Sequence, residues 1–153
     1  MSRVRAEVLS PSAVRLTCVI RRPRDTVFDA WLNPAEVAVW FLPAPNIQCK
    51  VLEMDARPGG KYSLSMEGGD CSGISGTYEV VDRPNKIVFT WFSESSNFEK
   101  AVTLVTLNFI AVEEGTRLVL THEKLSNETS RDNHARGWTG CLTSLERHLA
   151  PTQ

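Results

Sequence analysis

The sequence predicts an α+β fold in which a curved antiparallel sheet of about seven strands surrounds one long C-terminal helix, with two short helices after the first strand. Two observations lead to this fold. Apolar and polar residues alternate through most of the chain between residues 13 and 122, which is typical of strands with one buried face. From about Ser130 the apolar residues recur every three or four positions, which is typical of an amphipathic helix.

The first strand and the first helix follow a short polar arm. Residues 13–20 alternate between apolar and polar side chains and form the first expected strand. Pro23 suits the first position of a helix, because its missing N–H is not needed there, and Asp25 lies favourably in the positive first turn. The apolar face of this helix consists of Val27, Phe28 and Trp31.

A second short helix is expected directly after the first. The segment Asn33-Pro34-Ala35-Glu36 combines an N-cap, a proline at the first helical position and a glutamate that reaches back to the cap, which is the capping-box pattern. Pro43 and Pro45 end this helix. Its apolar face consists of Val37, Trp40 and Phe41, so two aromatic residues lie at its end beside an irregular segment.

The remaining strands and the closing helix follow in order. Alternating segments separated by glycine, proline and asparagine predict strands joined by tight turns. These strands cover residues 51–54, 61–66, 76–81, 87–92, 102–112 and 116–122, with a polar loop at 93–100. The apolar stripe of the last helix consists of Trp138, Leu142, Leu145 and Leu149.

Length and composition indicate a single domain covering residues 1–153. The chain is 42% hydrophobic and 23% charged, which is ordinary for one globular domain of this length. A formal net charge of -1, without a basic cluster among aromatics, argues against a nucleic-acid partner. No run of about eighteen apolar residues predicts a membrane span, and the start lacks the apolar stretch of a signal peptide. We therefore expect a cytoplasmic protein without a membrane partner.

Neither a metal site nor a cofactor site is predicted. Four cysteines, Cys18, Cys49, Cys71 and Cys141, are scattered without a Cys-x-x-Cys pair, so we expect reduced thiols. His122, His134 and His148 are equally dispersed, whereas a zinc site uses closely spaced ligand pairs. The glycine pairs precede strands and therefore lack the helix N-terminus that binds a phosphate group.

A curved sheet around one helix commonly leaves a cavity, and the alternation shows which residues face it. The exposed Arg117 marks the outer face of its strand, so His122 points inward, and Tyr78 and Val80 are both expected on the inner side of theirs. Gly137, next to Trp138 on the long helix, suggests a close contact with another element. The candidate cavity-lining residues are Phe28, Trp31, Trp40, Phe41, Tyr62, Leu64, Tyr78, Phe89, Trp91, Leu120, His122, His134, Trp138 and Leu142.

This inventory favours binding over turnover. No carboxylate pair is placed on the inner face and no Gly-x-Ser-x-Gly segment occurs, so no residue is assigned a catalytic role. Many aromatics with a few donors, chiefly His122, His134 and Tyr62, suit an apolar or aromatic small molecule. The same aromatics also fit a plain core. His122 fits a core histidine satisfied by a neighbouring hydroxyl or carbonyl, and His134 fits a solvent-facing histidine near the helix start.

A series of motifs follows in one order along nearly the whole chain. The motifs are Phe28-Asp29-Ala30-Trp31 with Asn33-Pro34 and Trp40-Phe41, Pro58-Gly59-Gly60 before Tyr62, Gly76-Thr77-Tyr78-Glu79-Val80 leading to Phe89-Thr90-Trp91, Gly115-Thr116-Arg117-Leu118 ending in His122, and His134 before Gly137-Trp138 with Leu142 and Leu145. In this order they resemble the START-like superfamily, also called SRPBCC and typified by the birch-pollen allergen. Within it, the resemblance is to the group similar to the C-terminal domain of activators of the ninety-kilodalton heat-shock protein's ATPase.

The resemblance implies a helix-grip fold, with the two short helices as a V at one end of the sheet. Related proteins are carriers of lipids or hormones, chaperone activators and polyketide cyclases, so fold alone does not decide the function. Three alternatives follow: a small-molecule binding protein, an interaction module whose outer surface contacts a chaperone in a stress response or another protein partner, and a cyclase-like or hydrolase-like enzyme with His122 or His134 as base. A homodimer through an exposed strand or the long helix is a further expectation.

Overall fold

A computed structural model of the chain describes residues 3–68, 73–94 and 99–151. Within these ranges, eight strands form one antiparallel sheet in the order β1-β2-β8-β7-β6-β5-β4-β3. The elements are β1 (Arg5–Ser10), β2 (Ala13–Ile20), α1 (Arg24–Leu32), α2 (Pro34–Trp40), β3 (Gln48–Met54), β4 (Lys61–Glu67), β5 (Gly73–Asp82), β6 (Lys86–Ser93), β7 (Thr103–Val112), β8 (Gly115–Glu123) and α3 (Glu128–His148). The expected α+β fold with its long C-terminal helix is confirmed. Cys71 and part of the expected loop at 93–100 lie outside the described residues.

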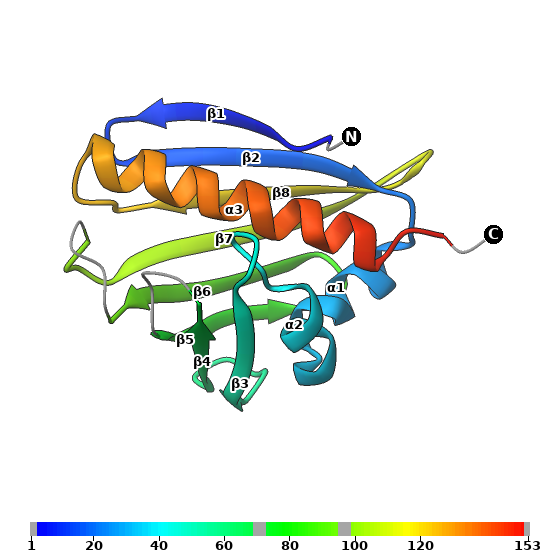
Figure 1. The fold of residues 1–153 in the computed structure, drawn as a ribbon. Coiled ribbons are helices and arrows are strands. Elements are labelled where there is room, and N and C mark those ends of the chain that lie inside the picture. Colours follow the sequence, from blue (N-terminus) through cyan, green and yellow to red (C-terminus); the bar gives the residue numbers. More distant parts are fainter. Residues whose placement is uncertain (1–2, 69–72, 95–98, 152–153) are drawn as a thin grey trace.

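The three helices lie on one side of the sheet. Figure 1 shows α3 running across the face of the sheet, with α1 and α2 together near its C-terminal end. Two contacts hold that end of α3: the Nε–H of Arg22, just before α1, donates to the Leu149 carbonyl at 2.9 Å, and His148 Nε2 lies 2.9 Å from Oε1 of Glu36 in α2. None of the described helices has both the length and the apolar character that crossing a membrane requires.

The polar arm at the start of the chain is a strand. Residues Arg5–Ser10 pair antiparallel with β2, with Arg5 opposite Thr17 and Val8 opposite Val14. Because β1 is an edge strand whose first five side chains are exposed, its sequence carries no alternation, and the backbone pairing alone defines it. The sheet therefore has one strand more than the alternation predicts, and the two short helices follow β2.

The alternation places most inner residues correctly. His122 is fully buried while Arg117 on the same strand is exposed, and Ile87, Phe89 and Trp91 are all buried. The expectation for Val80 is wrong, because it is 36% exposed. The pairing between β5 and β6 shifts between Tyr78 and Val80, so one extra residue on β5 reverses the facing of the residues that follow.

The helix starts differ in detail from the expected caps. The helix α1 begins at Arg24, so Pro23 occupies the N-cap position and not the first helical position. At α2 the Asn33 side chain accepts a hydrogen bond from the Ala35 N–H at 3.0 Å, as expected of an N-cap. Glu36 faces His148 instead of completing a capping box, because the end of α3 packs beside α2.

Candidate functional site

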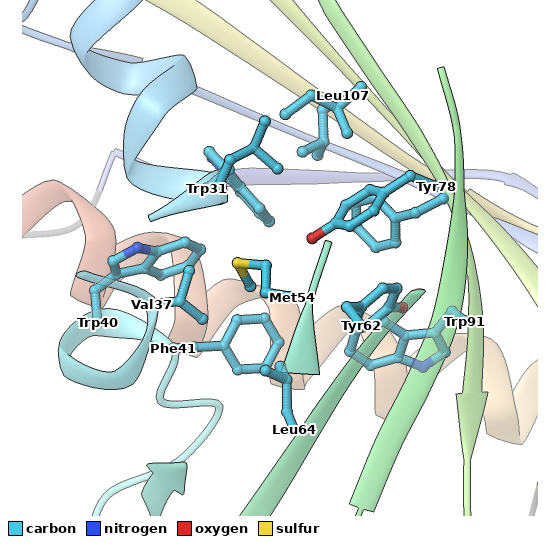
Figure 2. A pocket seen from close by; sticks show the side chains of 13 residues that line it. Trp31, Val37, Trp40, Phe41, Met54, Tyr62, Leu64, Tyr78, Trp91 and Leu107 are labelled. Carbon is cyan, nitrogen blue, oxygen red and sulfur yellow. The ribbon is translucent and has the colours of Figure 1, made fainter. Parts of the chain in front are cut away.

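In the described part of the chain, two hollows between the helices and the sheet are candidates for a site. The first, which we call the inner hollow, lies between the two short helices and strands β3 to β7, and Figure 2 shows its lining. Its volume is about 30 Å³, enough for about one water molecule. It is lined by Trp31, Leu32, Val37, Trp40, Phe41, Met54, Tyr62, Leu64, Tyr78, Ile87, Phe89, Trp91 and Leu107. Side chains therefore fill nearly all of this space.

The second hollow, which we call the helix groove, lies between the first half of α3, the segment after α2 and strands β4 to β6. Its volume is about 150 Å³. It is lined by Phe41, Pro43, Met66, Ile74, Trp91, Ser93, Asn133, His134, Gly137, Trp138 and Cys141. Phe41 and Trp91 line both hollows and separate one from the other.

The fourteen sequence-predicted residues divide into three groups. Eight line the inner hollow: Trp31, Trp40, Phe41, Tyr62, Leu64, Tyr78, Phe89 and Trp91. His134 and Trp138 line the helix groove, as do Phe41 and Trp91. The remaining four, Phe28, Leu120, His122 and Leu142, are at most 1% exposed, belong to the core and line neither hollow.

Several residues of the groove were not predicted as lining residues, although a signal for them exists. Asn133, Gly137 and Cys141 follow each other at intervals of four, so they form a helix row directly beside His134 and Trp138. Widening the apolar stripe of α3 by one position would have found them. Pro43 had no such signal, because it lies in irregular backbone between α2 and β3.

Aromatic rings form the wall of the groove nearest the core. The Trp91 and Trp138 rings lie 4.8 Å apart between centroids, and Phe41 meets Trp138 edge-on at 5.7 Å. These three side chains come from β6, α3 and the end of α2, so they hold the helix against the sheet. Such tilted and edge-on contacts are the arrangements that aromatic rings prefer.

His122 is held by hydrogen bonds on both ring nitrogens. The indole N–H of Trp138 donates to His122 Nδ1 at 2.9 Å, so Nδ1 is the acceptor nitrogen of the ring. The proton of the neutral ring then lies on Nε2 and donates to Thr103 Oγ1 at 2.7 Å, and Thr103 donates to the Trp91 carbonyl at 3.1 Å. This chain of bonds links α3, β8, β7 and β6.

The same environment keeps His122 neutral. Complete burial lowers its pKa well below the ordinary value, and the neighbouring His134 lowers it further. Because the single lone pair of the neutral ring already accepts from Trp138, His122 has no nitrogen with which to take a proton from a substrate. The sequence left open whether His122 contacts a ligand or is a core histidine with its hydrogen bonds satisfied. The structure shows the core histidine.

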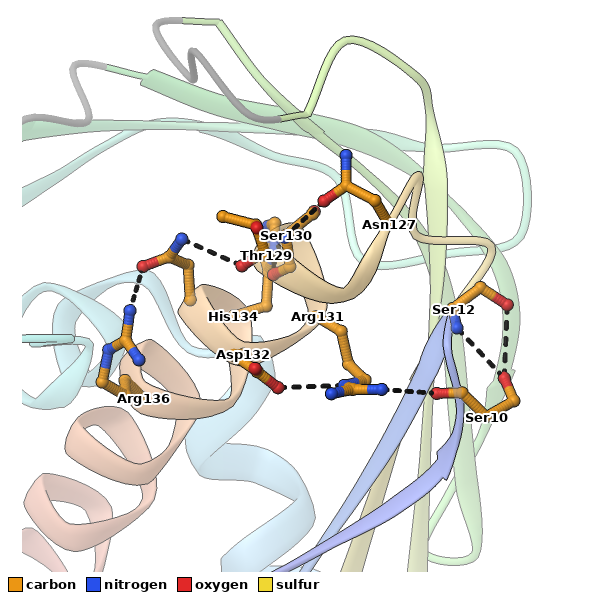
Figure 3. A network of polar contacts seen from close by, with 10 residues as sticks. Ser10, Ser12, Asn127, Thr129, Ser130, Arg131, Asp132, His134 and Arg136 are labelled. Carbon is orange, nitrogen blue, oxygen red and sulfur yellow. Dashed lines mark hydrogen bonds and ion pairs between the residues drawn. The ribbon is translucent and has the colours of Figure 1, made fainter.

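His134 is buried against His122, with ring centroids 4.8 Å apart, so the reading as a solvent-facing histidine is wrong. Its Nδ1–H donates to the Ser130 carbonyl at 2.8 Å, one turn earlier on α3, which puts the ring lone pair on Nε2. Figure 3 shows His134 and Ser130 near the start of α3, where Asn127 caps the helix. Burial lowers the pKa of His134, although the bond to Ser130 and the charge of Glu99 partly oppose this.

A buried carboxylate, that of Glu99, lies beside Ser130 and His134, and the sequence analysis did not predict it. It is only 1% exposed, and its oxygens accept from the Ser126 N–H at 2.8 Å, the Ser130 hydroxyl at 2.5 Å and the Ser126 hydroxyl. Burial acts to raise the pKa of Glu99, but the hydrogen bonds from Ser126 and Ser130 outweigh it and the net pKa is lowered. No periodicity marks Glu99, because it precedes β7 in irregular backbone.

The four indole N–H groups differ in their partners. Trp40 donates to the Ala30 carbonyl at 2.9 Å and Trp138 donates to His122. The Nε1 atoms of Trp31 and Trp91 are buried and have no hydrogen-bond partner among the residues that the structure describes. An unpaired buried donor typically costs about 1 to 3 kcal/mol, so both groups need an explanation.

Other polar groups near the hollows are already engaged. The Tyr62 hydroxyl, a predicted ligand contact, donates to the Thr90 carbonyl at 2.6 Å. The thiols of Cys18, Cys49 and Cys141 are buried, and burial raises the pKa of Cys49 to about 11. In the described part of the chain, no three His, Cys, Asp or Glu side chains are grouped to hold a metal ion.

The close contact expected at Gly137 occurs instead one turn later. A Cβ atom at position 137 would meet only the Pro43 Cβ, at an ordinary 3.7 Å. At Gly140 the same atom would lie 2.2 Å from the Pro43 carbonyl oxygen, which no side chain tolerates. The segment after α2 therefore packs on Gly140, and Gly137 borders open space in the groove.

Comparison with known proteins agrees with this architecture. Residues 21–150 match the family described as "Activator of Hsp90 ATPase homolog 1-like protein". The chain belongs to this family. Membership confirms the START-like resemblance that the sequence motifs indicate. No curated protein matches the sequence.

Solved structures share the fold of this family member over most of its length. The protein CV1439 from Chromobacterium violaceum is 26% identical, with a TM-score of 0.84 over 94% of this chain and 100% of that one. A Rhodobacter sphaeroides protein is 18% identical, with a TM-score of 0.81 over 97% of this chain and 95% of that one. CalU16 from Micromonospora echinospora is 23% identical, with a TM-score of 0.69 over 91% of this chain and 76% of that one. The last two, being under 25% identical, show the fold alone.

Proposed function

We propose that this protein binds a small apolar molecule with an aromatic ring, and that the helix groove is the binding site. The observation that carries the proposal is the wall of the groove, where Phe41, Trp91 and Trp138 border a space of about 150 Å³. A cavity of about this size holds one benzene-sized ring. Few polar side chains among many apolar ones is the usual composition of a small-molecule site.

The groove is a better candidate than the inner hollow, which carries most of the sequence-predicted lining residues. A space of about 30 Å³ holds no ring, and widening it would require core side chains such as Trp40 to move. Trp40 is fully buried and donates to the Ala30 carbonyl, so its displacement would break a buried hydrogen bond.

Binding is proposed here and turnover is not. A cyclase-like reaction needs a base, and the acceptor nitrogen of His122 is occupied by Trp138. His134 lines the groove, but its Nδ1 donates to a backbone carbonyl and burial lowers its pKa. In the proposal it forms part of the groove lining.

Two substitutions at Gly137 provide the test, because this position borders the groove and has room for a Cβ atom. In Gly137→Leu the new side chain occupies the groove, whereas Gly137→Ala adds a single methyl group. The probe is phenylacetylene, an uncharged one-ring hydrocarbon, and binding is followed by the amide NMR shifts of groove-lining residues.

We expect saturable shifts in the wild type and in Gly137→Ala, and an affinity at least about tenfold lower in Gly137→Leu, since that side chain excludes the ring. Thermal unfolding of all three proteins serves as the control for folding. Equal affinity in Gly137→Leu, or no saturable shift in the wild type, would overturn the proposal.

A further inference from the structure

We infer that the natural ligand of the helix groove is uncharged and carries a hydrogen-bond acceptor that meets the indole N–H of Trp91. This inference rests on the proposed binding function and adds the chemical class of the ligand. Two independent features carry it: a buried donor without a partner, and a groove lining without charged side chains.

The donor belongs to Trp91 in the middle of the aromatic wall. Trp91 is 6% exposed, and its Nε1 atom is buried without a hydrogen-bond partner within residues 3–68, 73–94 and 99–151. Such groups are rare in folded proteins, because the N–H loses its bond to water and gains nothing in return. Trp138, whose ring lies 4.8 Å away, has its N–H paired with His122. Of these two neighbouring indoles, Trp138 therefore has a hydrogen-bonded N–H and Trp91 does not.

The orientation of the Trp91 ring connects its donor with the groove. Figure 2 shows the Trp91 nitrogen on the edge of the ring that is turned away from Tyr78. Tyr78 lines the inner hollow and not the groove, while Trp91 lines both. The nitrogen edge is therefore turned to the side on which the groove lies. Because Nε1 itself has almost no accessible surface, an acceptor atom of a ligand completes the missing bond only once the Trp91 ring or a neighbouring groove side chain moves to admit it.

The second unpaired indole, Trp31, lies outside the groove. Trp31 lines only the inner hollow, whose volume of about 30 Å³ is that of a single water molecule. Figure 2 shows the Tyr78 hydroxyl pointing into this hollow toward Trp31. Because Trp31 does not border the groove, a ligand in the groove leaves the Trp31 N–H without a partner. Trp31 therefore serves as a matched control for Trp91.

The lining of the groove argues for an uncharged ligand. Among the described residues that border it, none is Asp, Glu, Lys or Arg. His134 is kept neutral by burial, and the nearest buried charge is the carboxylate of Glu99, which is bonded to Ser130 behind His134. A carboxylate ligand would enter an apolar site without a cation and beside a negative charge, which is unfavourable.

The experiment compares three one-ring probes of similar size: benzonitrile, phenylacetylene and benzoate. Benzonitrile and phenylacetylene have the same linear shape, but only benzonitrile presents a nitrogen acceptor. We expect benzonitrile to bind about 3- to 10-fold more tightly, which is the range of one net hydrogen bond. Benzoate should bind at least about tenfold more weakly than benzonitrile. In the ¹H–¹⁵N spectrum, benzonitrile should move the Trp91 indole signal downfield and phenylacetylene should not.

Variants separate the contribution of Trp91 from general packing. In Trp91→Phe the preference for benzonitrile should fall to about 1-fold, whereas Trp31→Phe should keep it. If Trp91→Phe does not fold, the indole signal of the wild type still decides, because the four tryptophans give four separate signals.

Each outcome bears on a defined statement. Equal affinities for benzonitrile and phenylacetylene, without a shift of the Trp91 indole signal, would show that no ligand acceptor bonds to the Trp91 N–H. Binding in the groove would remain supported. Benzoate binding as tightly as benzonitrile would overturn the uncharged class. If none of the three probes binds, the proposed function fails and the inference fails with it.

Discussion

Trp138 on α3 donates its indole N–H to Nδ1 of His122 on β8, and the two atoms lie 2.9 Å apart in the core. This bond fixes the tautomer of His122 and joins the long helix to the centre of the sheet. It also makes Trp138 a poor position at which to test ligand binding, because its loss would leave a buried acceptor unpaired. The consequences can be measured on the folded protein.

Replacing Trp138 by phenylalanine should lower the free energy of unfolding by about 2 to 4 kcal/mol, from lost packing and an unpaired His122. Urea denaturation measures the loss. His122→Leu should also destabilise, because it leaves the Trp138 and Thr103 groups unpaired. The double variant should be about 1 kcal/mol more stable than the sum of the single losses implies. Strictly additive losses would show that the bond contributes nothing.

Stability should fall as the pH drops below about 6.5, the ordinary pKa of histidine in the unfolded chain. His122 and His134 both have lowered pKa values when folded, so in this range the unfolded state binds more protons. Each histidine contributes a slope of up to about 1.4 kcal/mol per pH unit. The lowered pKa of Glu99 acts only at more acidic pH. Urea denaturation at a series of pH values from about 7.5 to about 5 measures this loss of stability. A flat profile would contradict the neutral state assigned to both rings.

Two alanine substitutions on α3 should have opposite effects. Gly137→Ala should stabilise the protein by about 0.5 to 1 kcal/mol, because alanine is the better helix former and its Cβ makes an ordinary contact with Pro43. Gly140→Ala should destabilise it by about 1 to 3 kcal/mol, because its Cβ would overlap the Pro43 carbonyl. Melting temperatures measure both effects. Shifts of the two variants in the same direction would contradict the close packing of the Pro43 carbonyl on Gly140.

Replacing Glu99 by glutamine should cost about 1 to 3 kcal/mol, because an NH₂ group would then face donors from Ser126 and Ser130. Amide hydrogen exchange at the start of α3 should become faster. The matched control is Glu128→Gln in the first turn of the same helix, where the exposed side chain should change stability by less than about 0.5 kcal/mol. Equal effects of the two changes would show that burial of Glu99 is unimportant.

The alternation of apolar and polar residues predicted most of the sheet because its inner face is buried while its outer face contacts water. It failed where the backbone departs from regular pairing. The extra residue on β5 turned Val80 outward, and the exposed edge strand β1 carries no alternation at all.

The candidate site was predicted in its residue types more than in its location. The aromatic residues were found, yet most of them fill the inner hollow and leave no space for a ligand. Whether a cavity is empty depends on the side chains that reach it from irregular backbone, such as Pro43. The same holds for Glu99, whose burial results from its bonds to Ser126 and Ser130 and has no periodic signal.

Native mass spectrometry tests the central claim, that the helix groove binds a small molecule, most directly. Wild-type protein and Gly137→Leu are incubated with the same extract of small cellular metabolites, and the native masses are compared with the denatured ones. We expect one small-molecule adduct on the wild type that is released on denaturation and absent from Gly137→Leu. Adducts of equal amount on both proteins, or on neither, would contradict the claim.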